Sequence, residues 1–305
     1  MNKPQLTPSS SSPLETTHLG PASNSYFSQR LRLNYADWGN ADKPPLILLH
    51  GGKDHCRNWD WTAQALRKDW HIIAPDLRGH GDSQWSSDGN YPMLAYIYDL
   101  ANLIDQLKLA PVTIVAHSLG GNIALQYTGL YPEKVRRLVA IEGLGLSPEM
   151  QAKHAKIEFS KRIHDWISEK QKFAGKSPRR YESFAAALER MQAENGHLSD
   201  EQARHLTTHA VIRNEDGSYS WKFDPLLRNW WPHQIANEQT EKLWASIACP
   251  TMLMYGDDSW ASNPDKDGRI KHFSDNVIVK SYENAGHWLH HDQFDRFIAD
   301  LREFL

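Results

Sequence analysis

The chain has 305 residues, a length that suits one large α/β domain carrying an insertion. Its formal net charge of −3 provides no basic field for binding phosphates, which argues against a nucleic-acid partner. No stretch approaches 18 consecutive apolar residues, so no membrane span is expected. Cys56 and Cys249 lack metal-ligand spacing, and we interpret them as reduced, partly buried thiols.

The N-terminal segment, residues 1–25, is rich in Ser, Thr and Pro and lacks the apolar core of a secretory signal peptide. We therefore expect a disordered tail over 1–25 and a cytoplasmic protein. The next segment, Tyr26 to Trp38, alternates weakly between apolar and polar residues and ends at Gly39-Asn40. This pattern predicts an antiparallel hairpin at the start of the fold.

Short apolar runs then alternate with segments of helical periodicity. Such runs suit strands buried on both faces, and helices between them indicate a doubly wound, mostly parallel sheet. Ligands of these sheets bind beyond the carboxyl ends of the strands. The predicted strands are 46–49, 71–74, 112–116, 135–141, 250–255 and 277–279, and the predicted helices are 59–68, 96–107, one that follows residue 118 and ends within 129–132, and 294–305.

From residue 149 to about residue 240 the pattern is helical and amphipathic, as expected of a cap inserted after a sheet strand. We predict a core over 26–146 and 245–305 and a cap over 147–244. Helix starts are expected at Ser177-Pro178 and at Ser199, where Gln202 completes a capping box.

Asp216 and Gly217 predict a small hairpin between residues 211–212 and 219–221 of the cap. The cap is also rich in aromatic residues. These side chains either face a substrate pocket or pack the cap against the sheet, and the candidates for the pocket are Trp221, Trp230 and Trp231.

The segment around Ser118 carries the strongest chemical signal. A β-branched run, 112–115, stops close to Ser118 and a helical pattern follows at once, so the chain must reverse within about three positions. Ala116 and Gly120 stand two positions before and after the serine, as a crowded turn with positive φ requires. Ala116 departs from the common Gly-x-Ser-x-Gly pattern by one methyl group. Such a nucleophile elbow presents a hydroxyl to a base on one side and a carbonyl on the other.

Five motifs at predicted strand ends, taken in chain order, resemble those of the α/β-hydrolase family. They are His50-Gly51-Gly52, residues 76–83, the elbow at Ser118, an acid-bearing turn after Tyr255, and Gly286-His287. The resemblance covers roughly 26–146 and 245–305, and the chain order of serine, acid and histidine is also that of the family. It implies an α/β-hydrolase fold with an inserted helical cap.

The resemblance also implies roles for individual residues. Ser118 would attack the substrate carbonyl, and His287 would take its proton and later give it to the leaving group. The backbone N–H groups of Leu119 and Gly52 would stabilise the oxyanion. Residues 76–83 would form a tight loop held by internal ion pairs. Further candidates for the substrate pocket are His50, Gly51, His117 and Trp288.

The acid of the triad has two candidates. The family usually places an Asp three positions after the strand-end glycine, but this chain has Ser259 there. Asp258 is preferred, because a turn one residue shorter could still aim its carboxylate at His287. Glu142 is the alternative, since some family members carry the acid after the sixth strand, and Glu142 follows 135–141.

These residues predict a serine hydrolase that cleaves a carboxylic ester or related acyl bond through an acyl-enzyme. It would act on a small molecule, as a monomer or homodimer, without cofactor or metal. Hydrolysis of lactones or C–C bonds and acyl transfer use the same triad and stay open. A non-catalytic binding protein on a hydrolase scaffold is an alternative from another class.

A metal-dependent hydrolase is a third hypothesis, because the chain has 16 histidines. His205 and His209 lie at i, i+4, but they lack the nearby Glu arrangement of a catalytic site, and we interpret them as a helical surface pair. His290 and His291 are interpreted as solvated neighbours on the closing helix.

Overall fold

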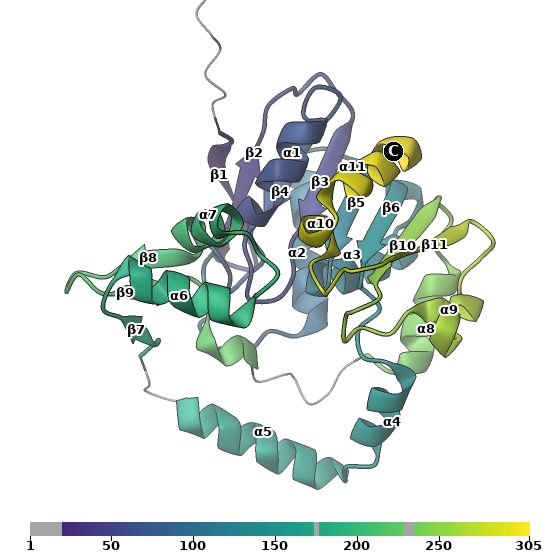
Figure 1. The fold of residues 1–305 in the computed structure, drawn as a ribbon. Coiled ribbons are helices and arrows are strands. Elements are labelled where there is room, and N and C mark those ends of the chain that lie inside the picture. The colour runs from purple at the N-terminus through teal and green to yellow at the C-terminus, as the bar shows by residue number, and fades with distance from the viewer. Residues whose placement is uncertain (1–19, 174–176, 229–234) are drawn as a thin grey trace, which may run out of the picture.

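An eight-stranded sheet forms the centre of the computed structural model, which describes residues 20–173, 177–228 and 235–305 (Figure 1). Its first two strands are antiparallel to their neighbours, and the other six run parallel, as the sequence predicts. In spatial order the strands are β1 (Ala22–Ser28), β2 (Leu31–Asp37), β4 (His71–Pro75), β3 (Pro45–Leu49), β5 (Val112–His117), β6 (Val135–Ile141), β10 (Thr251–Gly256) and β11 (Val277–Tyr282).

The opening hairpin begins earlier than expected. Gln29 and Arg30 join β1 to β2 with φ angles of 47° and 67°, the pair of positive values that a type I′ turn requires. Ala22 pairs with Asp37 and Ser25 with Asn34, so residues 22–25 belong to a strand and their assignment to a disordered tail is wrong. The polar side chains of this edge strand look like those of a tail, and only pairing with β2 orders them. Residues 1–19 of the predicted tail lie outside the described residues.

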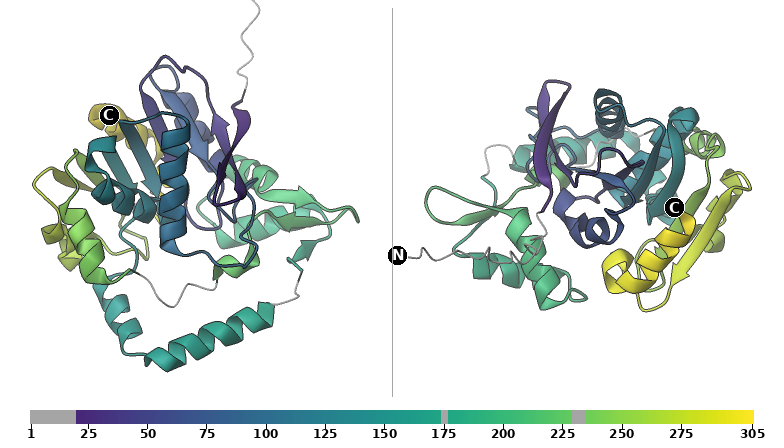
Figure 2. Two further views of the ribbon diagram at one scale, coloured as in Figure 1. Left: turned by 180° about the vertical axis from the view of Figure 1, so that it is seen from behind. Right: turned by 90° about the horizontal axis from the view of Figure 1, so that it is seen from above.

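Helices cover both faces of the sheet. Helices α2 (Met93–Gln106), α3 (Leu119–Leu130) and α8 (Asn237–Ala245) pack on one face, and α1 (Asp60–Leu66) and α11 (Phe294–Phe304) pack on the other (Figures 1 and 2). Side chains of β5 alternate between the two cores: Ile114 lies in one and Val115 in the other. Burial on both faces therefore explains the unbroken apolar runs of the parallel strands.

The predicted core strands and helices form within three residues of their expected ends. The short elements of the core are η1 (Cys56–Trp59), η2 (Pro132–Lys134), α9 (Pro264–Asp267), η4 (Arg269–His272) and α10 (Leu289–Asp292). Within the described ranges, none of the helices combines the length and apolarity that crossing a bilayer would need.

The cap follows β6 and contains helices and a three-stranded antiparallel sheet. Its helix α7 packs against η1 of the core (Figure 1). The elements are α4 (Pro148–Ala155), α5 (Phe159–Phe173), β7 (Arg180–Tyr181), α6 (Phe184–Glu194), α7 (Asp200–Ala210), β8 (Val211–Arg213), β9 (Tyr219–Trp221) and η3 (Pro225–Arg228).

Two local predictions for the cap are confirmed and one is wrong. The turn at 216–217 joins β8 to β9, and Ser199 and Gln202 form both hydrogen bonds of the capping box. No helix starts at Ser177-Pro178, because the chain there leads into β7 and its pairing with β9. Helix α6 begins instead after Ser183, whose hydroxyl accepts the N–H of Ala186.

The expected cap, 147–244, also reaches too far along the chain. Helix α8 packs on α3 in the layer that covers the sheet, and its Trp244 is buried in the core. The approach is close because Gly129 lies on α3: a Cβ at this position would stand 2.2 Å from the carbonyl oxygen of Leu243. Because α8 begins with polar residues, its packing in the layer on the sheet is not apparent from the sequence.

Candidate active site

Ser118 stands at a sharp turn between β5 and α3, as the elbow pattern predicts. Its φ of 51° and ψ of −115° lie in a strained region for a residue with a side chain. Its N–H donates to the carbonyl oxygen of Ile141 at 2.8 Å, which ties the turn to the end of β6. A Cβ at Gly120 would lie 2.5 Å from the carbonyl oxygen of His50, so only glycine lets the helix start this close to β3.

His287 reaches Ser118 from the loop between β11 and α10. Its Nε2 lies 3.0 Å from the serine Oγ, and its Nδ1 is hydrogen-bonded to Oε2 of Glu142. A carboxylate only accepts, so Nδ1 carries the proton and Nε2 is left to accept from the serine hydroxyl. The three side chains therefore form a continuous relay of hydrogen bonds.

Glu142 holds the buried end of this relay, directly after β6. Its side chain is fully buried, whereas that of His287 is 24% exposed. The N–H of Gly256 donates to Oε1 at 2.9 Å, and the Ser259 hydroxyl donates to Oε2 at 2.6 Å. Together with His287, these donors replace the water that an ionised carboxylate loses on burial.

Asp258 does not occupy the position expected of it, beside His287. Its side chain is exposed, in a turn closed by hydrogen bonds from the N–H of Asp257 to Tyr282 and from the N–H of Asp258 to Ala285. The next residue along the chain, Ser259, does contact the acid: its hydroxyl donates to the Glu142 carboxylate. The structure thus brings the alternative acid, Glu142, to His287, and the preference for Asp258 is corrected.

The two backbone groups expected to bind the oxyanion lie on neighbouring segments. A Cβ at Gly52 would lie 3.9 Å from Cδ2 of Leu119, an ordinary contact distance. A Cβ at Gly51 would lie 2.8 Å from Nδ1 of His117 and 3.2 Å from Cβ of Ser118, so Gly51 is the position at which the loop needs glycine to approach the elbow. Leu119 is the first residue of α3, where backbone N–H groups have no partner within the helix.

His50 and His117 support these loops instead of lining the pocket, so their expected place is corrected. Nε2 of His117 lies 2.8 Å from the carbonyl oxygen of His287, and Nε2 of His50 accepts the N–H of Leu77 at 3.0 Å. Both side chains are buried, and burial lowers the pKa of His50 to about 4 and that of His117 well below its ordinary value. Both rings are therefore neutral at physiological pH.

His290 and His291 are buried as well, so their interpretation as solvated neighbours is wrong. Both place Nε2 beside Oδ1 of Asn58, at 2.9 and 3.0 Å. The ring of His290 stacks on Trp59 and lies 4.8 Å from that of His117. These contacts fasten α10, which follows His287, to the core.

The loop over 76–83 is held mainly by hydrogen bonds to backbone groups. Asp76 accepts the N–H groups of Cys56 and Asp82 at 2.7 and 2.9 Å. Arg78 forms its ion pair outside the loop, at 2.6 Å from Asp99 of α2. The expectation of internal ion pairs is therefore wrong, although the loop is tight as predicted.

Cys56 and Cys249 are free and buried.

A cavity of about 860 Å³ opens between His287 and the cap. Gly52 and His287 line it from the core, and Leu206 lines it from the cap. Of the aromatic candidates, Trp221 and Trp288 line the cavity, and Trp230 and Trp231 lie outside the described residues.

Trp260 and Asp54 are among the cavity residues that the sequence did not predict. Trp260 is 58% exposed and its ring lies 4.8 Å from that of His287; its place just after the strand-end turn is the available signal. Asp54 is buried, with Oδ1 accepting the N–H of His55. Burial raises its pKa to about 8, so its carboxyl group is largely protonated at neutral pH.

Comparisons with known proteins agree with the fold. A family model described as alpha/beta hydrolase fold matches residues 44–294. Esterase YbfF of Escherichia coli is 27% identical over 86% of this chain and 92% of its own. A serine hydrolase-like protein of Danio rerio is 31% identical over 61% of this chain, which spans 57% of that relative. The thioesterase domain from the curacin biosynthetic pathway shares the fold, with a TM-score of 0.79 and 21% identity over 93% of this chain and all (100%) of its own.

Proposed function

We propose that this chain, which belongs to the α/β-hydrolase family and is a hydrolase, cleaves a carboxylic ester or related acyl bond. Ser118, His287 and Glu142 would be its catalytic triad. The observation that carries the proposal is the relay from Oγ of Ser118 through the imidazole to the buried carboxylate. A relative named as an esterase, aligned over most of both chains, supports the choice of bond.

Acylation begins when Oγ of Ser118 attacks the substrate carbonyl carbon while Nε2 of His287 takes the hydroxyl proton. The negative charge that develops on the carbonyl oxygen is met by the N–H groups of Leu119 and Gly52. Glu142 stabilises the imidazolium formed at His287. When the tetrahedral intermediate collapses, the C–O bond breaks and the leaving alkoxide receives the proton from Nε2.

Deacylation repeats the sequence with water as the nucleophile. His287 removes a proton from water, the hydroxide attacks the acyl carbon, and the Ser118 oxygen leaves with the proton returned from Nε2. The exposed edge of His287 faces the cavity, from which both the ester and the water arrive. A cavity of about 860 Å³ suits a small or medium acyl substrate.

The experiment is labelling with a fluorophosphonate probe together with multiple-turnover hydrolysis of aryl esters. Ser118→Ala should abolish both, because the probe reacts only with an activated serine. Ser246→Ala, which changes an exposed hydroxyl at the end of α8, is the matched control and should be labelled like the wild type. Labelling that persists in Ser118→Ala would contradict the proposal, and so would stoichiometric ester binding without turnover, which would favour a binding protein.

A further inference from the structure

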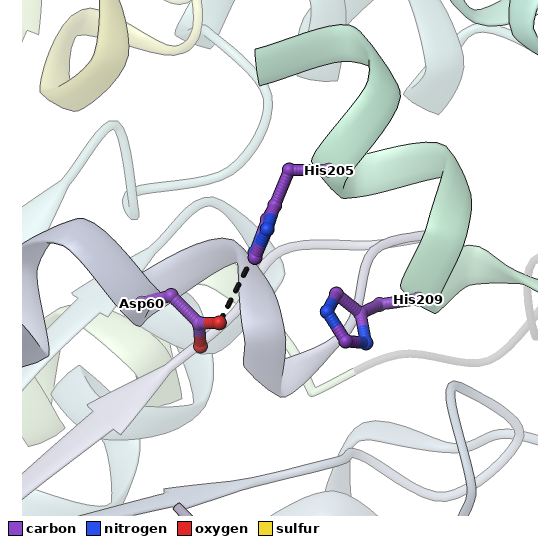
Figure 3. Close-up of side chains that lie close together, drawn as sticks. All are labelled: Asp60, His205 and His209. Atoms are coloured by element: carbon purple, nitrogen blue, oxygen red, sulfur yellow. Dashed lines mark ion pairs between the residues drawn. The ribbon is translucent and has the colours of Figure 1, made fainter. Parts of the chain in front are cut away.

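A second cluster of carboxylate and imidazole groups joins the cap to the core. Asp60 lies at the start of α1, and His205 and His209 lie one turn apart on α7 (Figure 3). One oxygen or nitrogen atom from each side chain lies within 4.8 Å of the others. The two histidines are half-buried against the core, so their interpretation as a helical surface pair is wrong. We propose that Asp60, His205 and His209 bind a divalent transition-metal ion, of which Zn²⁺ is the type, and that the ion fastens the cap to the core.

The donor set fits this class of ion. Two imidazoles at i, i+4 on one helix with a carboxylate from another element supply three protein ligands, and water completes a tetrahedron. Zinc–ligand bonds of about 2.0–2.2 Å place tetrahedral ligand atoms about 3.3–3.5 Å apart. Nε2 of His205 already lies 3.1 Å from Oδ2 of Asp60, so the largest adjustment falls to His209. Rotation of that side chain brings in the third ligand atom.

The hydrogen bonds around the cluster show which nitrogen atoms are available. Nδ1 of His209 lies 3.5 Å from NH1 of Arg57, and because a guanidinium only donates, this nitrogen carries a lone pair, which faces Arg57 while that side chain is in place. Nε2 of His205 stands between two acceptors, Oδ2 of Asp60 and the carbonyl oxygen of Arg57, and therefore carries a proton. A bound ion would take the place of that proton.

Arg57 is the competitor of the ion. Its Nε and NH2 donate to the Asp60 carboxylate at 2.9 and 2.6 Å, so its charge occupies the side of the cluster that a cation would neutralise. The Arg57 side chain is 28% exposed and can turn into solvent when an ion binds. The protein therefore exchanges one cation for another at Asp60, and removal of Arg57 should strengthen metal binding.

An ion at this place would hold the wall of the cavity. Helix α7 contributes Leu206 and Ala210 to the cavity lining, and the carbonyl oxygen of Leu206 lies 3.1 Å from Nε2 of His55. His55 follows Gly52 by three residues in the same loop. Fixing α7 to α1 through the ion would thus restrain the contact between cap and core beside the cavity, which predicts higher thermal stability with the ion bound.

The experiment measures binding of Zn²⁺ alone to the full chain, by competition with a chromophoric chelator and by the shift in Tm. We expect one tight equivalent and a rise in Tm for the wild type. His205→Gln and His209→Gln should each weaken binding by about tenfold or more and abolish the shift. His154→Gln, an exposed histidine of α4, is the matched control and should bind like the wild type. Arg57→Ala should bind about tenfold more tightly, because the competing guanidinium is gone.

A spectroscopic measurement on the wild type keeps the test independent of how the variants fold. The electron paramagnetic resonance spectrum of one bound equivalent of Cu²⁺ should show hyperfine coupling to two imidazole nitrogens. The proposal is overturned by Zn²⁺ binding weaker than about 1 mM. It is also overturned by binding that both histidine variants retain, by an affinity that falls in Arg57→Ala, or by a Cu²⁺ spectrum without nitrogen ligands.

Discussion

Two clusters in this protein pair a buried carboxylate with imidazole, and they differ in what else the carboxylate binds. Glu142 accepts from the neutral donors of Gly256 and Ser259 as well as from His287. Asp60 is bound by the permanent cation of Arg57 as well as by His205. The guanidinium of Arg57 balances the charge of Asp60, whereas the donors to Glu142 other than His287 are neutral groups.

The electrostatic consequence differs accordingly. Burial raises the pKa of Asp60, but hydrogen bonds from His205 and Arg57 outweigh it and hold the pKa below its ordinary value. At Glu142 the positive charge formed on His287 during catalysis is the complement of the buried carboxylate. The surroundings of the carboxylate therefore separate a proposed catalytic dyad from a proposed metal site.

The largest expected effect tests which carboxylate serves His287. Glu142→Gln should lower kcat by about ten-thousandfold, because an amide favours the wrong tautomer and leaves the imidazolium without its charge. Asp258→Asn, the matched change at the exposed acid, should leave kcat within about twofold. Steady-state hydrolysis of an aryl ester measures both. The reverse pattern, with Asp258→Asn inactive and Glu142→Gln active, would show that Asp258 and not Glu142 serves His287.

A smaller effect is expected where a neutral donor supports Glu142. Ser259→Ala removes the hydroxyl that lies 2.6 Å from Oε2, and we expect kcat to fall by about ten- to a hundredfold, since a hydrogen bond to a charged group contributes about 1.5–3 kcal/mol. KM should change little, because Ser259 positions the acid and does not touch substrate. Ser259→Thr keeps the hydroxyl and should restore most of kcat. A loss confined to KM, or one that Thr does not rescue, would contradict this role.

The smallest effect concerns Asp54, a buried carboxyl group of the cavity lining. Its pKa of about 8 in the folded protein exceeds its ordinary value of 3.8, so the folded state binds more protons between these values. The free energy of unfolding should fall as pH rises through this interval, and Asp54→Asn should remove that loss. We expect the variant to exceed the wild type in Tm at pH 9, by about 2–4 °C for each kcal/mol relieved, and to match it near pH 4.

Thermal unfolding measured across that pH range checks the Asp54 prediction. Asp42→Asn, at an exposed carboxyl group, is the control and should follow the wild type at every pH. A Tm difference that stays constant with pH, or that is largest at acid pH, would show that Asp54 is not the titrating group.

Much of the fold could be predicted because its signals are local. The β-branched run, the small residues around Ser118 and the helix that follows lie within about 15 positions, and the structure has the expected turn with φ of 51°. Parallel strands such as β5 are buried on both faces, so their apolar runs stand out in the sequence.

The misplaced features depend on contacts between distant segments. Glu142 meets Ser259 across 117 positions, and the sequence offered three oxygen-bearing side chains, those at 257, 258 and 259, where the acid is usually found. Asp60 and His205 are brought together only by the docking of α7 on η1. Residues 22–25 look like a polar tail until β2 pairs with them. A local sequence pattern cannot predict which distant segment a residue will contact.

The most direct test of the pairing of Glu142 with His287 is the proton NMR signal of His287 Nδ1–H. A proton held between an imidazole and a carboxylate is strongly deshielded, so we expect a far-downfield resonance in the wild type. This resonance should persist in Asp258→Asn and disappear or move upfield in Glu142→Gln. A downfield signal that survives Glu142→Gln and is lost in Asp258→Asn would contradict the account.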